Sequence, residues 1–241
     1  MKSFDNVYIT GDTHGDFNGI KNFCIDRDTT KNDLIIILGD SGINYYGENN
    51  SRERNLKKVV NNLPITIFCI RGNHEARPED RINIKSIDYN IGNNVYREDR
   101  YESILYAQDG GEYIFNNKKI LTIGGAYSVD KYYRLIRGWN WFSNEMLSQE
   151  EQDLIYNKCR DKHYDYVFTH TCPIEWEPTD LFLSMIDQDS VDKTMEQFLS
   201  KIEKHITYDN WFFGHYHDDR IKMFNNPKIN MLFHKIITLE E

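Results

Sequence analysis

Short apolar runs alternate with longer polar stretches along the chain. Six of these runs have the length of buried strands, at residues 7–10, 34–38, 65–70, 120–123, 166–169 and 211–213. Helical patterns lie between several of them, at about 16–27, 51–62, 148–162 and 189–205, the third opening with the capping pair Ser148 and Glu151. The tail from Arg220 alternates in short pieces, as small antiparallel strands do. The pattern predicts an α/β protein with an antiparallel portion in its second half.

Composition and length favour one folded domain. No repeat or linker divides the 241 residues, so we expect a single domain over residues 1–241. Hydrophobic residues make up 39% and aromatic residues 14%, which excludes a disordered chain. No apolar run approaches the roughly 18 residues of a membrane span and no signal peptide is visible, so we expect a cytoplasmic protein without membrane contact. The four cysteines lack metal-ligand spacing and should be free thiols.

Polar clusters follow five of the six apolar runs. Because sites in open α/β sheets form beyond the carboxyl ends of strands, these clusters are expected to converge at one edge. The glycines among them allow sharp turns there. The side chains that carry chemistry in these clusters are Asp12, His14, Asp40, Asn73, His74, His170, His215 and His217.

All of these except His74 are candidate metal ligands. Carboxylate, amide and imidazole groups without a thiolate can hold two neighbouring divalent cations, and a carboxylate is suited to bridging them. The donor types fit Mn, Fe, Zn, Ni or Co. Each motif alone is more simply a turn or a surface histidine, but their joint occurrence after strand ends favours a metal site.

The order of the motifs resembles that of the calcineurin-like metallophosphoesterases. Gly-Asp-Thr-His-Gly, Gly-Asp, Gly-Asn-His-Glu, a single His after a strand and Gly-His-Tyr-His follow one another between Asp12 and His217. Segments 124–131 and 170–173 are similar to bacterial and prophage-encoded members. The resemblance implies a four-layer sandwich, with two packed mixed β-sheets flanked by helices. It also implies one metal on Asp12, His14 and His217, a second on Asn73, His170 and His215, and Asp40 between them.

The resemblance further implies a phosphoesterase that hydrolyses phosphate esters by attack of a hydroxide shared by two metal ions. His74 follows the ligand candidate Asn73 and is the candidate general acid, because imidazole titrates near neutrality. A purely structural His74 is the alternative, since adjacency in sequence does not prove geometry.

The substrate is less well indicated. Protein Ser/Thr phosphatases continue Gly-Asp-x-x-Asp-Arg-Gly, whereas here Asp40 leads into Ser41-Gly42-Ile43-Asn44, without the Asp that steadies the catalytic His or the Arg that grips phosphate. Candidate substrate-binding residues are Asn44, Arg71, Arg77, Tyr127 and Arg134. Arg71 could instead form a salt bridge, and the aromatic and basic loop after 120–123 could simply pack on itself.

The expected partner is a phosphorylated substrate, either a phosphoprotein or a small nucleotide-like phosphate. A net charge of −9 argues against binding duplex nucleic acid, although bound cations can reverse the local field at a phosphate site. A cyclic-nucleotide or nucleic-acid phosphodiesterase is an alternative, because the same metal centre can cleave diesters. A non-catalytic interaction module on the same fold is a further alternative.

Overall fold

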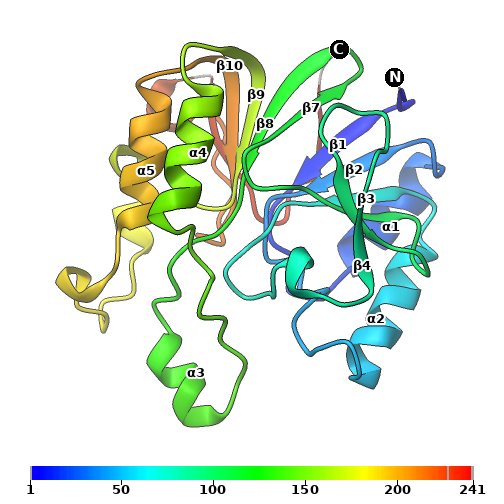
Figure 1. Ribbon diagram of the computed structural model, residues 1–241, viewed down its shortest axis with the longest axis horizontal. Coiled ribbons are helices and arrows are strands. Elements are labelled where there is room, and N and C mark those ends of the chain that lie inside the picture. Colours follow the sequence, from blue (N-terminus) through cyan, green and yellow to red (C-terminus); the bar gives the residue numbers. More distant parts are fainter. Residues whose placement is uncertain (1, 227, 240–241) are drawn as a thin grey trace.

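Two β-sheets pack face to face in the computed structural model, which describes residues 2–226 and 228–239 (Figure 1). In the described chain the first sheet has the order β12 (Ile237–Thr238), β1 (Val7–Thr10), β2 (Leu34–Ile37), β3 (Thr66–Cys69), β6 (Ile104–Tyr106), β5 (Val95–Glu98) and β4 (Ile84–Ile87). The second has the order β11 (Ile229–Met231), β10 (Thr207–Phe213), β9 (His163–Thr169), β8 (Lys118–Ile123) and β7 (Gly111–Phe115). The predicted fold class is confirmed.

Helices cover the outer faces of both sheets. In Figure 1, α1 (Asn18–Arg27) and α2 (Ser51–Asn61) lie on the first sheet, and α4 (Gln149–Cys159) and α5 (Thr194–Glu203) on the second. The central core is shared by the two sheets, with Phe68 of β3 buried in the same cluster as Phe168 of β9. Two further apolar cores lie beneath the helices. The resulting layers are helix, sheet, sheet and helix.

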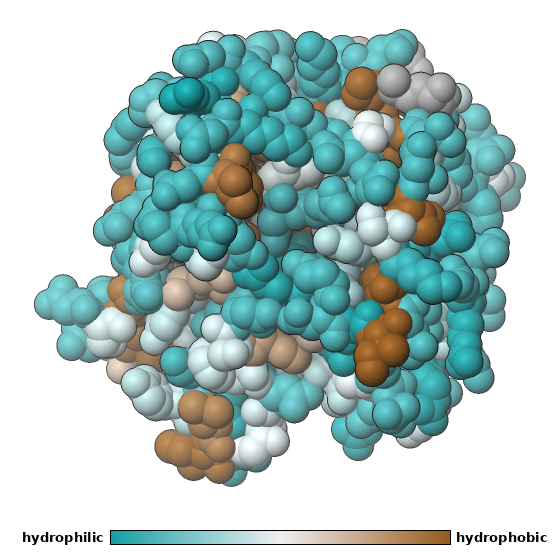
Figure 2. Space-filling model, in the orientation of Figure 1, coloured by the Kyte–Doolittle hydropathy of each residue, from teal (hydrophilic) through white to brown (hydrophobic). Residues whose placement is uncertain are grey.

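One short helix stands apart from these layers. Helix α3 (Lys131–Arg137) projects from the body at the foot of the view in Figure 1, and Figure 2 shows apolar surface on this projection. Leu135 and Ile136 of this helix are 51% and 84% exposed. Within the described ranges, no helix has the length and apolar character needed to cross a bilayer.

The register of the parallel strands brings several strand ends to one level. Thr10 pairs with Ile37, which pairs with Cys69, so β1, β2 and β3 end together. In the second sheet Ile123, Thr169 and Phe213 are aligned in the same way. Every residue of β1, β2 and β3 is buried, because parallel strands are covered on both faces and therefore read as continuous apolar runs. Polar residues that follow these strands consequently gather at one edge.

The predicted elements are present with shifted ends. The six predicted strands and four predicted helices all appear, and Ser148 and Glu151 form the expected reciprocal cap of α4. The last helix begins at Thr194 rather than 189, after a turn of 3-10 helix over Gln188–Ser190.

The antiparallel pairing predicted for the tail is present in part, with β12 antiparallel to β1 and an antiparallel bridge between Arg220 and Met231, but most of the antiparallel portion lies earlier in the chain. It lies mainly over residues 84–123, because β4 and β5 are short and partly buried, β6 has only three residues, and β7 alternates buried and half-buried positions, which weakens their apolar signal. In the tail, whose residues 227 and 240–241 lie outside the described chain, β11 runs parallel to β10 and β12 antiparallel to β1. All four cysteines are buried and unpaired, as expected.

Candidate metal centre

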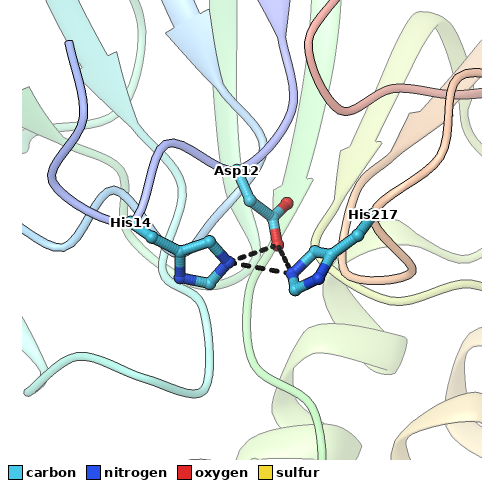
Figure 3. A group of neighbouring side chains, drawn as sticks. All are labelled: Asp12, His14 and His217. Carbon is cyan, nitrogen blue, oxygen red and sulfur yellow. Dashed lines mark hydrogen bonds and ion pairs between the residues drawn. The ribbon is translucent and has the colours of Figure 1, made fainter. Parts of the chain in front are cut away.

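Asp12, His14 and His217 form the first half of the site (Figure 3). Asp12 follows β1, and its Oδ2 lies 3.7 Å from Nε2 of His14 and 3.3 Å from Nε2 of His217. The two imidazole nitrogens are 2.8 Å apart. Asp12 is only 3% exposed, and its Oδ2 has no hydrogen-bond partner among the described residues. A buried carboxylate oxygen without a donor, faced by two ring nitrogens, fits a metal ion.

The second half gathers around His170, which directly follows β9. Its Nδ1 lies 2.8 Å from the Leu38 carbonyl oxygen, so Nδ1–H donates there and Nε2 is left as a ligand atom. Nε2 lies 2.8 Å from Oδ1 of Asn73 and 3.8 Å from Oδ2 of Asp40. The His215 ring is centred 5.0 Å from that of His170. Asp12, Asp40 and His170 offer ligand atoms within 4.8 Å of one another, so the two halves adjoin.

Asp40 lies between the two halves. Its Oδ1 accepts a hydrogen bond of 2.8 Å from the backbone N–H of His74, while Oδ2 lies 3.9 Å from Nδ1 of His14 and 3.8 Å from Nε2 of His170. Burial raises the pKa of Asp40, but the neighbouring His170, His74 and His14 outweigh burial and hold it well below its usual range. The carboxylate is therefore ionised and suitably placed to bridge two cations.

Asn73 is held in one orientation by groups outside the cluster. Its Nδ2 donates to Ser128 Oγ at 2.8 Å, and the Ser128 hydroxyl donates to Glu145 at 2.5 Å. The amide oxygen must then face His170. Ser128 and Glu145 thus orient a candidate ligand, and no sequence pattern indicated this role, because only the fold brings them to Asn73.

Backbone conformation supports a functional role for this edge. His14, Asp40, His215 and His217 adopt φ values of 46°, 46°, 70° and 55°, a left-handed region that costs a non-glycine residue about 1–2 kcal/mol. Such strain is retained where the side chain is needed. Close approach also requires glycine at position 72, where a Cβ would lie 1.9 Å from Oδ1 of Asp40.

Comparison with known proteins agrees with this geometry. The profile of the family described as calcineurin-like phosphoesterase matches residues 6–219. The chain belongs to the calcineurin-like phosphoesterase family. Members of this family are generally metal-dependent hydrolases of phosphate esters.

The fold of this calcineurin-like phosphoesterase is similar to that of the protein TT1561 of Thermus thermophilus, with a TM-score of 0.50 and 10% identity over 97% of each chain. A second solved structure has a TM-score of 0.46 and 12% identity over 98% of each chain. No curated protein matches the chain significantly.

The candidate acid of this calcineurin-like phosphoesterase, His74, contacts the projecting helix α3. Arg134 places Nη2 3.0 Å from Nε2 of His74, and its Nε donates to Asp130 at 2.8 Å. The Asp130 carboxylate itself lies 4.0 Å from Nε2 of His74. Burial and the Arg134 guanidinium lower the pKa of His74, against an opposing effect of Asp40. His74 is therefore flanked by an Asp and an Arg, the two residue types that are missing from the segment after Asp40. Here both come from the segment that follows β8.

A cavity of about 420 Å³ opens beside these residues and has Tyr127 in its wall, together with Asp40, Asn73 and His74. Of the five candidate substrate-binding residues, the structure therefore places Tyr127 at the cavity and Arg134 on His74.

The other three candidates are engaged elsewhere. Arg71 forms an ion pair of 2.9 Å with Asp109, the alternative considered for it, and Arg77 forms one with Glu151. Asn44 is buried, and its Oδ1 accepts a hydrogen bond from the Tyr106 hydroxyl. None of the three lines the cavity.

Proposed function

We propose that the chain is a dinuclear metal-dependent phosphoesterase that hydrolyses phosphate esters. The observation that supports this most is the convergence of Asp12, His14 and His217 on one point and of Asp12, Asp40 and His170 on an adjacent one. Asn73 and His215 would complete the second set. When bound there, two divalent cations would lower the pKa of a shared water and neutralise charge on the phosphoryl oxygens.

The chain's own groups would bind the phosphate and move protons. Arg134 is the cation beside the cavity-lining His74, so it would take the phosphate-gripping role of the Arg missing after Asp40. Nε2 of His74 accepts from Arg134 as arranged here, because a guanidinium can only donate. If Arg134 turned to the phosphate oxygens, Nε2 would be free to take up a proton from water and donate it to the leaving oxygen.

The expected substrates are phosphorylated small molecules or phosphoproteins, and the expected ions are Mn, Fe, Zn, Ni or Co. The location in the cytoplasm expected from the sequence stays a prediction. The aromatic and carboxylate groups lining the cavity fit a small ester better than a polyanionic duplex.

The test compares para-nitrophenyl phosphate with its bis ester, with Mn²⁺ and after chelation. We expect Mn²⁺-dependent hydrolysis with the monoester preferred. His74→Ala should retain Mn²⁺ binding but lose most turnover of esters with poor leaving groups, whereas His205→Ala, at an exposed position, should behave as the unmodified protein. Preference for the bis ester would favour a phosphodiesterase. No bound metal and no activity would instead favour a non-catalytic module.

A further inference from the structure

The cavity extends beyond the candidate ligands to an apolar wall. This wall comes from the segment between β9 and α5 and includes Leu181, Phe182, Leu183, Ile186 and Val191. An ion pair holds the segment together, since Lys193 Nζ lies 2.6 Å from Glu177 and 4.7 Å from the centre of the Phe182 ring. The wall is therefore anchored on charged groups that also line the cavity.

An aromatic surface continues from this wall toward the metal centre. The Phe182 ring is centred 6.5 Å from that of Tyr216, with 24° between the ring planes. The Tyr216 hydroxyl lies 3.1 Å from that of Thr171, the residue after His170. Both rings line the cavity. Nearly parallel rings beside the place where a phosphate would bind offer flat apolar contact to the rest of an ester.

A buried carboxyl also lines the cavity. Glu196 is 4% exposed, and its Oε1 accepts a hydrogen bond of 2.8 Å from Thr171. Its Oε2 is buried and has no hydrogen-bond partner among residues 2–226 and 228–239. Because an unpaired buried carboxylate oxygen is costly, a ligand donor that reaches Oε2 would be stabilised there.

We infer that this chamber binds the leaving group of the phosphate ester, and that this group is a flat, largely apolar ring with an N–H or O–H donor directed at Glu196. The inference rests on the proposed function and narrows its substrate class. A cavity of about 420 Å³ suits a small-molecule ester. A small aliphatic alcohol would leave the rings and the Glu196 oxygen without contacts.

The test compares monoesters of the same ring system with and without an N–H donor at the ring edge. Among nucleotides, purine riboside 5′-monophosphate has no donor on its base, whereas inosine and guanosine 5′-monophosphates have one or more. The non-nucleotide pair is 1-naphthyl phosphate, without a donor, and 5-amino-1-naphthyl phosphate, with one. Glycerol phosphate, which lacks a ring, is the control. Burial raises the pKa of Glu196 to about 7, so assays with Mn²⁺ at roughly pH 8.5 keep the carboxyl ionised. We expect kcat/KM to be about tenfold or more higher for the donor-bearing member of at least one pair.

Four variants show which residues cause the preference. Glu196→Met should abolish the preference for the donor, so that kcat/KM becomes equal within the pair that responds, and Glu196→Gln, which keeps the side-chain shape, serves if the Met variant does not fold. Phe182→Ala should raise KM for ring esters more than it raises KM for glycerol phosphate. Met185→Ala, on the same segment but 84% exposed and outside the cavity, should match the unmodified protein. The pair that responds tells whether the ring is a nucleobase or another arene.

Calorimetric binding of inosine, 1-naphthol and 5-amino-1-naphthol separates the inference from the proposed function. If a donor-bearing compound binds in a way that depends on Glu196 but no ester is hydrolysed, the phosphoesterase proposal is refuted and the proposed binding chamber is supported. If kcat/KM is equal for glycerol phosphate and all ring esters, the proposed role of the chamber is refuted while the phosphoesterase activity is supported. A preference for the donor that survives in both Glu196 variants would also overturn the inference.

Discussion

Gly72→Ala tests whether the position of Asp40 controls the metal centre. Strands β2 and β3 end side by side, and the residues that follow them meet closely. A Cβ at position 72 would lie 1.9 Å from Oδ1, 2.2 Å from the backbone N and 2.6 Å from Cγ of Asp40. Rotation of the Asp40 side chain cannot relieve a clash that includes its own backbone, so the backbone must move.

The size of the effect follows from these distances. Ordinary contacts of a Cβ begin at 3.4 Å and the backbone N of Asp40 would lie at 2.2 Å, so the two backbones must separate by about 1.2 Å. Overpacking of this kind costs roughly 1–3 kcal/mol of unfolding free energy, and we expect the upper end because Asp40 is 1% exposed. A ligand displaced by over an ångström should also weaken Mn²⁺ binding by about 100-fold, since loss of outer contacts alone costs 10–100-fold.

Urea unfolding without metal and calorimetric titration with Mn²⁺ measure the two effects. Gly19→Ala in α1 is the matched control, because a Cβ there meets nothing within 4 Å. In a helix, Ala is favoured over Gly by roughly 0.5–1 kcal/mol, so this control should be slightly more stable and bind Mn²⁺ normally. If Gly72→Ala unfolds and binds Mn²⁺ like the unmodified protein, the packing of Gly72 against Asp40 does not position a metal ligand.

Three further predictions concern strain, pH and phosphate binding. His14 has a φ of 46°, so metal-free His14→Gly should be about 1 kcal/mol more stable to urea than His14→Ala; equal stabilities would show that the backbone there is unstrained. Burial raises the pKa of Glu196 from 4.5 to about 7, so the folded chain holds this proton more tightly than the unfolded chain, and the stability it contributes is lost as pH rises through 7. Between pH 4.5 and 7, the unfolding free energy of Glu196→Gln should therefore rise by up to about 3 kcal/mol relative to that of the unmodified protein, as measured by urea titration. A difference in unfolding free energy that stays constant over this pH range would contradict the prediction. Arg134→Ala should lower kcat/KM for para-nitrophenyl phosphate about 100-fold without changing Mn²⁺ affinity, and Arg134→Lys should restore this activity only in part. If Arg137→Ala, on the same helix, loses as much activity, the effect belongs to α3 as a whole and not to Arg134.

The sequence alone was sufficient for most of the parallel strands, though not for β6 or β11, and for the polar residues at the strand ends. β1, β2 and β3 are buried on both faces, so each appears as an unbroken apolar run, and the residue after the run must lie at the sheet edge. The sequence therefore predicts that the groups around Asp12 and Asp40 lie close together. Strands β4 to β7 were not predicted, because β4, β5 and β7 are only partly buried and β6 has three residues, so none of them appears as a long apolar run.

Only the tertiary structure decided which residues surround these ends. Arg71, Arg77 and Arg134 were equal candidates in the sequence, yet ion pairs to Asp109 and Glu151 engage the first two, and a helix of seven residues carries the third onto His74. Glu196 likewise reaches the cavity from α5, far along the chain from Asp12. Burial along a strand is a local property that a sequence displays, whereas partners across loops depend on how separate elements pack, which no local pattern contains.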